Sequence, residues 1–339
     1  MHRITKPIGH AHQDHIDPQE RAKIKRILIS RPNNRLGNLL LITPLVQEIN
    51  ETFPDSKIDL FVRGGLAKIL FANYDSIDRI IELPGKPFKH LLQYLCSWRD
   101  LRKQTYDLVI NVDGESSSGR LSTLVAKSRH KIFGDVPVSE GNCPHMAKKP
   151  VYQLRDYLNS KGFTDCSQNV ATLNLNLSSA ELTQGKKLLT KLVQNNKPTI
   201  AIFTYATGAK CYPESWWTPF YQKLQQAFPH HNIIEVLPKE NVSQISFAAP
   251  VFLSNDVREI GSLIANTEVF IGADSGIMHL ASASKIPTVG LFSVSDEHKY
   301  QPYGNDSISI NTNTYDADAA IGMIRDVVYK NSLRYCDFS

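Results

Sequence analysis

Residues 269–292 read VFIGADSGIMHLASASKIPTVGLF. The apolar run 269–271 predicts a β-strand, residues 276–283 predict a helix, and the apolar run 288–292 that follows a proline predicts the next strand. A strand, a polar turn, a helix and a second strand form the repeating unit of a parallel α/β sheet. In such a sheet the turn lies at the carboxyl end of its strand, beside the first backbone N–H groups of the helix.

The polar turn in this stretch, Asp274-Ser275-Gly276, has two interpretations. The start of a helix attracts anions through its free N–H groups and its dipole, so these residues are candidates for holding an anionic ligand. The same spacing fits an ordinary turn in which Ser275 or Asp274 is the N-cap of the helix.

The segment Asp274-Ser-Gly-Ile-Met-His279, followed by a helix of small residues and the run 287–292, resembles the signature of the lipopolysaccharide heptosyltransferase family, glycosyltransferase family 9. The similarity extends over most of the chain from about Lys25 onward. It implies an α/β protein of the GT-B fold, with two Rossmann-like doubly wound domains facing a central cleft. It also implies an inverting, metal-independent enzyme that transfers heptose from ADP-heptose to the inner core of lipopolysaccharide.

The resemblance also implies which residues contact the donor. The implied donor-binding residues are Thr207, Gly208, Lys210, Glu240, Asp274, Ser275, Gly276, Ile277, Met278 and His279. A catalytic role for Lys210 agrees with the chemistry, because transfer without a metal needs a cation to stabilise the departing diphosphate. Glu240 matches the position that contacts the nucleotide ribose. For His279, a general base, a phosphate contact and a polar core residue remain open, and the last two are favoured.

The loop after the first expected strand, residues 26–30, reads RPNNRLGN. It lacks the glycine patterns of dinucleotide sites and ATP-binding phosphate loops, which disfavours both classes. The family ends this loop in Gly-Asp, whose Asp is the proposed general base, whereas this chain has Gly37-Asn38. Asn38 can orient an acceptor hydroxyl but cannot take its proton. Arg31 and Arg35 could bind a carboxylate or phosphate of the acceptor, or face solvent.

Two carboxylates are candidates for the missing base. Asp113 and Glu115 follow the expected buried strand 106–112. Successive strand-to-helix loops open at one edge of a parallel sheet, so both carboxylates should lie beside the first loop. The alternative is that they cap a helix expected from Arg120 and bond to the loop backbone.

The rest of the chain continues to alternate strands and helices. Further expected strands are 57–62, 77–83, 199–203 and 233–237, and further expected helices are 88–103, 152–159, 178–193, 255–265 and 316–330. Thr43-Pro44 is typical of an N-cap and a first-turn proline, and Ser178-Ser-Ala-Glu181 of a capping box. Alternation in residues 171–177 predicts an edge strand, and residues 134–150 predict a long loop that covers the acceptor.

A chain of 339 residues with 42% apolar and 21% charged residues fits two soluble domains. The expected parts are a mobile tail 1–22, an acceptor domain 23–177, a nucleotide-sugar domain 178–315 and a final helix 316–339 that packs back on the first domain. Residues 1–177 carry 25 Lys and Arg against 18 Asp and Glu, and residues 178–339 carry 13 against 15. The basic first half suits an anionic acceptor or membrane surface, but a well-solvated surface gives the same pattern.

Neither a membrane helix, which needs ~18 apolar residues, nor a signal peptide is evident, so we expect a cytoplasmic protein, at most peripheral at the inner membrane. Five scattered cysteines and the lack of a His or carboxylate triad predict no metal site. The expected partners are a nucleotide sugar and an anionic saccharide or lipid-linked acceptor, with no cofactor, no nucleic acid and a monomeric chain. The alternatives are a same-fold glycosyltransferase with another donor or acceptor, and a catalytically weak sugar-nucleotide-binding protein.

Overall fold

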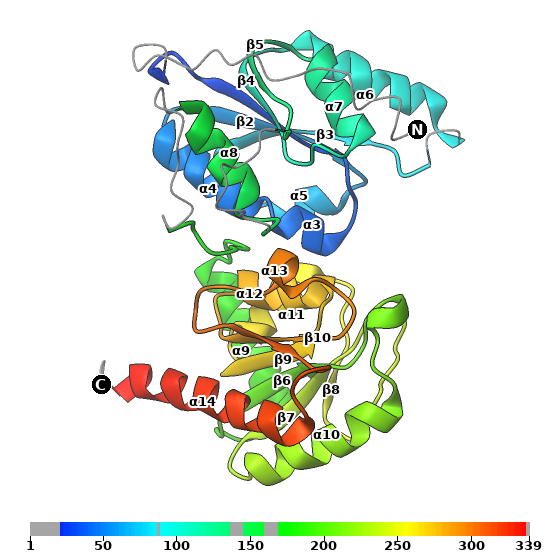
Figure 1. The fold of residues 1–339 in the computed structure, drawn as a ribbon, viewed down its shortest axis with the longest axis vertical. Helices are drawn as coiled ribbons and strands as arrows, with labels where there is room; N and C mark the ends of the chain where they lie inside the picture. Colours follow the sequence, from blue (N-terminus) through cyan, green and yellow to red (C-terminus); the bar gives the residue numbers. More distant parts are fainter. Residues whose placement is uncertain (1–20, 87–88, 136–144, 159–168, 337–339) are drawn as a thin grey trace. The chain divides into compact units, whose positions relative to one another are not determined.

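The computed structural model describes residues 21–86, 89–135, 145–158 and 169–336. The chain divides into two compact units, Met1–Ala171 and Thr172–Ser339, each built on one parallel sheet (Figure 1). The division lies a few residues before the domain limit expected at residue 177. The α/β class and the two Rossmann-like halves predicted from the sequence are confirmed.

The first unit contains a five-stranded sheet in the order β3-β2-β1-β4-β5. Its strands are β1 (Arg26–Arg31), β2 (Lys57–Arg63), β3 (Ile77–Leu83), β4 (Thr105–Asn111) and β5 (Lys127–Ile132). Ile29 of β1 lies between Leu60 of β2 and Ile110 of β4, and all three side chains are buried. These apolar runs become central strands because helices cover both faces of a parallel sheet. The strand order reverses between β1 and β4, and the carboxyl ends at such a switch point are where α/β sheets bind ligands.

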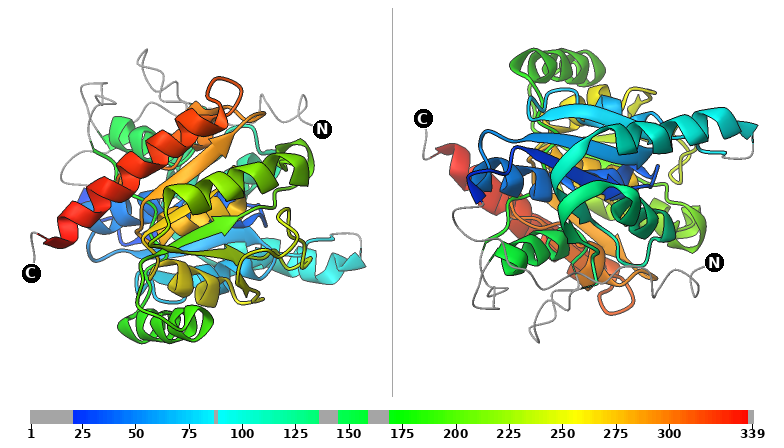
Figure 2. Two further views of the ribbon diagram at one scale, coloured as in Figure 1. Left: turned by 90° about the horizontal axis from the view of Figure 1, so that it is seen from below. Right: turned by 90° about the horizontal axis from the view of Figure 1, so that it is seen from above.

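Helices cover the two faces of the first sheet separately (Figures 1 and 2). One face carries α3 (Leu36–Leu40), α4 (Thr43–Thr52), α5 (Leu66–Leu70) and α8 (Lys149–Leu158), and the other carries α6 (Leu91–Lys103) and α7 (Ser117–Val125). Helix α6 is held by its inner face, where the Trp98 ring meets the edge of Phe61 at a centroid distance of 5.3 Å. Leu101 of α6 is buried in the same core cluster.

The second unit contains a six-stranded sheet in the order β11-β10-β9-β6-β7-β8. Its strands are β6 (Thr199–Phe203), β7 (Asn232–Val236), β8 (Val251–Phe252), β9 (Val269–Ala273), β10 (Thr288–Phe292) and β11 (Ile308–Asn311). Every residue of β6, β9 and β10 is buried. The strand order reverses between β6 and β9, so this sheet has its own switch point.

The helices of the second unit complete its two layers. They are α9 (Ser179–Val193), η2 (Gly208–Lys210), α10 (Glu214–Ala227), α11 (Val257–Ile264), α12 (Gly276–Ala283), α13 (Glu297–Tyr300) and α14 (Ala317–Cys336). Trp217 and Phe220 of α10 share a buried cluster with Ile324 of α14. Helix α14 therefore belongs to the core of the second unit. Its expected packing on the first domain stays a prediction.

The edge strand predicted for residues 171–177 is wrong, because this segment pairs with no strand. Its alternation comes from two leucines, Leu173 and Leu175, that are buried against the second unit. The Leu175 side chain packs on Gly261 of α11, where an added Cβ would meet Leu175 Cδ2 at 2.5 Å. The Leu175 N–H donates to the Ala283 carbonyl at the end of α12. Burial by helices thus gives the same two-residue pattern as a strand.

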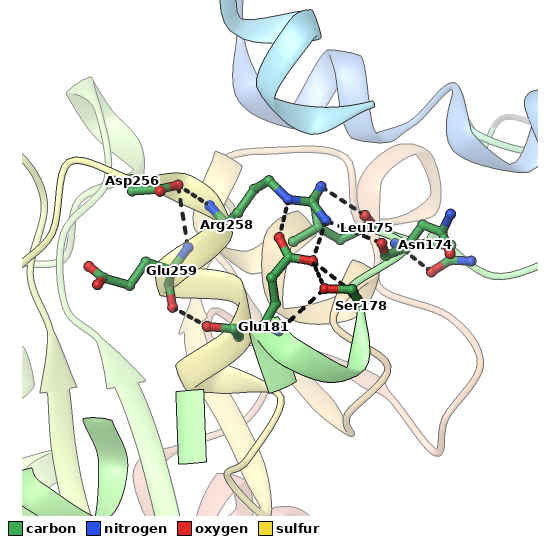
Figure 3. Close-up of polar contacts among 9 residues, drawn as sticks. Asn174, Leu175, Ser178, Glu181, Asp256, Arg258 and Glu259 are labelled. Atoms are coloured by element: carbon green, nitrogen blue, oxygen red, sulfur yellow. Dashed lines mark hydrogen bonds and ion pairs between the residues drawn. The ribbon is translucent and has the colours of Figure 1, made fainter. Parts of the chain in front are cut away.

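Arg258 of α11 holds the end of this segment in place (Figure 3). Its guanidinium pairs with both oxygens of Glu181, at 2.5 and 3.0 Å, and donates to the carbonyls of Leu175 and Asn176 at 3.2 Å each. Glu181 also accepts from the Ser178 N–H at 2.7 Å, which confirms the predicted capping box. One buried guanidinium therefore joins α11, the start of α9 and the backbone of the connecting segment.

Several local predictions need correction. Thr43 is the first residue of α4 and not its N-cap, because its hydroxyl donates back to the Leu40 carbonyl. Helix α7 begins at Ser117 and not at Arg120, and Ser116 is its cap. Helix α8 already begins at Lys149, inside the predicted loop 134–150. Strands β5, β8 and β11 and helix α13 were not predicted.

Most of the predicted tail 1–22 and part of the predicted loop 134–150 lie outside the described residues, as do the end residues of the predicted helices 88–103, 152–159 and 316–339. Within the described part of the chain, no helix has both the length and the apolar character needed to cross a membrane.

Candidate active site

An ion pair lies at the switch point of the second sheet. Asp274 directly follows β9, and Lys210 ends the short helix η2 in the loop after β6. The Lys210 ammonium lies 2.5 Å from Asp274 Oδ2. Asp274 is 6% exposed, whereas the Lys210 side chain is 39% exposed. Two residues that are 64 positions apart, both implied by the resemblance as donor-binding, are thus brought together at the carboxyl ends of neighbouring strands.

Two rings surround this ion pair. His279 Nε2 lies 4.0 Å from Asp274 Oδ1, on the side of the carboxylate that Lys210 does not contact. The Tyr300 ring of α13 lies 5.7 Å from the Lys210 ammonium and 6.4 Å from the His279 ring. His279 is buried, so a polar core position in contact with Asp274 fits better than free access to an acceptor. Tyr300 was not predicted, because it lies on a helix that the sequence pattern did not reveal.

The turn before α12 resolves the choice of N-cap. The Ser275 hydroxyl accepts from the Met278 N–H at 3.2 Å, so Ser275 is the cap and Asp274 is not. Helix geometry directs the N–H groups of Gly276 and Ile277 out of the first turn, where they are available to an anion. Met278 is buried and fixes the helix in the core. A carboxylate that faces Lys210 and a capped helix start therefore lie at the same edge of the sheet.

The other predicted donor residues lie on loops at the same sheet edge. Thr207 and Gly208 are exposed and begin the turn that carries Lys210, with Gly208 in the left-handed region at φ 64°. Glu240 is exposed beyond the carboxyl end of β7, the neighbour of β6. Its nearest cation is Lys239, at 3.9 Å. Neither Thr207 nor Glu240 is held rigidly by a side-chain contact with the Lys210 ion pair.

A buried carboxylate next to these loops was not predicted. Glu235 in β7 is fully buried and accepts hydrogen bonds from the hydroxyls of Thr204 at 2.5 Å and Ser243 at 2.7 Å. Burial raises the pKa of Glu235, and the two hydroxyl donors oppose that rise. The Thr204 hydroxyl in turn accepts from the Gln244 N–H. This network connects the loop that carries Glu240 to the residue after β6. The sequence signal that could have revealed the network is a Glu within an otherwise apolar strand.

The first sheet has a second ion pair at its own switch point. Arg31, the last residue of β1, lies 2.5 Å from Asp113 Oδ2, just beyond β4. Asp113 Oδ1 accepts from the Glu115 N–H at 3.1 Å. The predicted meeting of the two loops is therefore confirmed, and so is the bonding of Asp113 to its own loop backbone. Arg31 is buried and pairs with Asp113. An acceptor group that binds Arg31, as predicted, would therefore also lie next to the Asp113 carboxylate.

The remaining acceptor residues lie on or beside α3. Arg35 is exposed and precedes the helix, Gly37 is buried in it, and Asn38 is partly exposed. Glu115 is exposed on the loop after β4. The structure therefore places Asn38 on the short helix after β1, and both carboxylates on the loop after β4, at the carboxyl edge of the first sheet. Their roles stay predictions.

A cavity of about 420 Å³ lies away from both switch points. It is lined by residues at the amino ends of β7 and β8, among them His231, Asn232 and Pro250. In α/β sheets, ligands bind at the carboxyl ends of the strands, so this cavity does not belong to the candidate site. Among the described residues, no three His, Cys, Asp or Glu side chains group closely enough to hold a metal ion.

Comparison with known proteins gives relatives that align with most of this chain. The chain is 24% identical over 308 residues to lipopolysaccharide heptosyltransferase 3 of Escherichia coli K12, with 82% of this chain and 86% of that protein covered. Lipopolysaccharide heptosyltransferase 1 of Campylobacter coli is 24% identical over 299 residues, with coverage of 78% and 83%.

Solved structures share the fold at low identity. A family 9 glycosyltransferase of Veillonella parvula matches with a TM-score of 0.73 at 14% identity, over 90% of this chain and 98% of that one. The E. coli heptosyltransferase WaaC with ADP-2-deoxy-2-fluoro heptose matches with a TM-score of 0.61 at 16% identity, over 90% and 99%. The model of glycosyltransferase family 9 (heptosyltransferase) matches residues 95–322, which is more than half of the chain. This protein therefore belongs to glycosyltransferase family 9, the heptosyltransferases, and is a glycosyltransferase.

Proposed function

We propose that the enzyme transfers heptose from ADP-heptose to a saccharide acceptor of the lipopolysaccharide inner-core type, with inversion and without a metal. Two relatives carry the name lipopolysaccharide heptosyltransferase, and one structural neighbour was solved with an ADP-heptose analogue. The observation that carries the proposal is the partly exposed ammonium of Lys210, held by Asp274 beside the start of α12.

The proposed reaction is a direct displacement at the anomeric carbon. The acceptor oxygen forms a bond to that carbon as the bond to the diphosphate oxygen breaks, and attack from the opposite side inverts the configuration. ADP leaves with the bonding electrons. Lys210 and the N–H groups of Gly276 and Ile277 stabilise the negative charge that develops on it, the role that a metal ion has in other transferases. Asp274 keeps Lys210 in position and does not itself contact the diphosphate, because two anions repel.

The proton of the acceptor hydroxyl needs a base. Glu115 is exposed, and Asp113 pairs with Arg31 and accepts a backbone hydrogen bond. We assign the base to Glu115 or Asp113, both on the loop after β4, with Asn38 orienting the hydroxyl. The proposal includes a monomeric enzyme that works at the membrane surface on a lipid-linked acceptor.

Product analysis tests this function. Incubation with ADP-heptose and deacylated inner-core saccharide should give ADP and a glycoside whose anomeric configuration, read by NMR coupling constants, is opposite to that of the donor. EDTA should leave the rate unchanged. A retained configuration, or a rate that EDTA abolishes and magnesium restores, would contradict the mechanism.

The amide at Asn38 favours one other candidate function, a sugar-nucleotide-binding protein with little turnover. Calorimetry with ADP-heptose and a turnover assay on the same sample separate the two. Tight donor binding without transfer to any inner-core saccharide would support the binding protein.

A further inference from the structure

The largest group of exposed leucines in the described residues lies on two neighbouring helices of the first unit. Leu91, Leu92 and Leu95 of α6 are 57%, 80% and 55% exposed, and Leu121 and Leu124 of α7 are 39% and 46% exposed. Helices α6 and α7 lie side by side on the same face of the sheet (Figures 1 and 2). Leu91, Leu92 and Leu95, named here the leucine face, are three or four residues apart or adjacent in α6 and so form one exposed apolar strip of the kind that marks an interaction site.

The leucine face lies on the side of α6 that does not pack on the sheet. Helix α6 packs on the sheet through its other side, where Tyr94, Trp98 and Leu101 join the core. The Ser97 hydroxyl also donates to the Glu82 carbonyl of β3 at 2.6 Å. Because the inner side already holds the helix, the outward leucines are free to serve another purpose.

The charged residues next to the leucine face on α6 are mostly basic. Arg99 and Arg102 are exposed in the last turns of α6, beyond the leucines, and Lys127 is exposed directly after α7. The single acidic residue of α6, Asp100, is paired with Lys103 at 2.6 Å. An apolar strip flanked by Lys and Arg is typical of helices that lie in the headgroup layer of an anionic membrane.

The leucine face begins at the carboxyl edge of the first sheet, which is the edge where a lipid-linked acceptor is proposed to bind. Helix α6 follows the carboxyl end of β3, so its first turn lies at the edge of the first sheet where Arg31, Asn38 and Asp113 are found. Figure 2 shows the first turns of α6 at the periphery of this unit. A bilayer in contact with Leu91, Leu92 and Leu95 would therefore lie beside the loops proposed for the acceptor.

We propose that the leucine face binds an anionic lipid bilayer, with the leucines inserted among the headgroups and Arg99 and Arg102 at the lipid phosphates. This inference deepens the proposed function and rests on it for the choice of a bilayer over a protein partner. Lipid binding itself needs neither donor nor acceptor. It can therefore be measured separately from the activity.

Vesicle co-sedimentation of the full chain tests the inference. The wild-type protein should bind vesicles of phosphatidylcholine with phosphatidylglycerol and bind pure phosphatidylcholine weakly. The double variant Leu92→Ser/Leu95→Ser should bind mixed vesicles at least about tenfold more weakly, because inserted leucines contribute through their buried apolar area. The matched control is Leu182→Ser/Leu253→Ser, which alters two leucines of the second unit that are 39% and 48% exposed, and should bind as wild type does.

A charge variant tests the electrostatic part. Arg99→Gln/Arg102→Gln should lower binding to mixed vesicles and weaken its dependence on salt, while unfolding temperature stays unchanged because both residues are exposed. Equal vesicle binding by wild type and the leucine variant would overturn the inference. So would a wild-type dimer in size-exclusion chromatography that the leucine variant converts to monomer, because the occupant would then be a second copy. Binding of vesicles without binding of ADP-heptose would contradict the proposed function but would still support lipid binding by the leucine face.

Discussion

Each unit has an ion pair at the switch point of its sheet, Arg31–Asp113 in the first and Lys210–Asp274 in the second. In the first pair the more buried partner is the cation, whereas in the second pair it is the carboxylate. The side chains of Arg31 and Asp113 are 6% and 29% exposed, and those of Lys210 and Asp274 are 39% and 6% exposed. The same topological position thus presents a carboxylate to solvent in one sheet and an ammonium in the other. A carboxylate suits a hydroxyl nucleophile, and an ammonium suits a diphosphate leaving group. The opposite polarity supports the proposed division, with acceptor chemistry at the first sheet and donor chemistry at the second.

The largest expected effect comes from removing the exposed cation. Lys210→Ala should lower kcat/KM by about 10²-fold or more and weaken ADP binding, because the charge acts on the leaving diphosphate. Lys239→Ala is the matched control, since Lys239 is 79% exposed on a neighbouring loop and should leave both quantities within about twofold. Calorimetry with ADP and initial rates provide the measurement. An unchanged ADP affinity in Lys210→Ala would remove the basis for a donor site on the second sheet.

The next effect concerns the exposed carboxylates of the first sheet. Asp113→Asn/Glu115→Gln should lower kcat by at least about tenfold at nearly unchanged donor affinity. Thermal unfolding of the single variants separates a chemical from a structural cause. Asp113→Asn leaves the buried Arg31 without its ionic partner and should destabilise, while Glu115→Gln changes an exposed side chain and should not. Wild-type turnover in the double variant would show that neither carboxylate is the base.

A smaller effect is expected at the position where the sequence departs from its family. Asn38→Asp should change kcat by less than about threefold if Glu115 or Asp113 already serves as base, because a second carboxylate adds little to a base in place. The pH dependence of kcat provides the check. A gain of tenfold or more, with a new ionisation in the pH profile, would mean that the natural enzyme works without a base.

The smallest effect is on stability and involves Glu235. Burial raises its pKa above the ordinary value of 4.5, so its contribution to stability is present below about pH 4.5 and is lost as the pH rises through the raised value. Relative to Glu235→Gln, the wild type should therefore lose stability between pH 4.5 and pH 7, as measured by urea unfolding at both pH values. A parallel change in the two proteins would show that the carboxyl titrates alike when folded and unfolded.

Sequence patterns were sufficient for the elements with long apolar runs. Strands β6, β9 and β10 and helix α12 were located because buried parallel strands and the helix between them give an uninterrupted signal. Short or polar elements gave no such signal. Strand β5, which reads KSRHKI, is an edge strand whose charges face solvent, and α13 is a single turn. Tyr300 was missed for this reason.

The sequence indicated which residues belong to the candidate site. It did not indicate which of them form ion pairs or which partner of each pair is exposed. The family resemblance implied that Lys210 and Asp274 belong to one donor site, and parallel topology implied that the loops with Arg31 and Asp113 share one edge of the first sheet. Which partner of each pair is exposed depends on the packing of loops that have no periodicity. The polarity difference between the two sheets, and the hydroxyl donors around Glu235, therefore had to come from the structure.

The contacts of Arg258 determine where a stable fragment of the second unit can begin. A fragment that starts at Ser178 would keep the whole second sheet but lose the two carbonyls that accept from this guanidinium, together with the buried Leu173 and Leu175. A fragment that starts at Thr172 keeps all of them. The second unit, to which the donor site is proposed to belong, should therefore fold autonomously and bind ADP when it begins at Thr172. It should be unstable when it is trimmed to the first helix, α9.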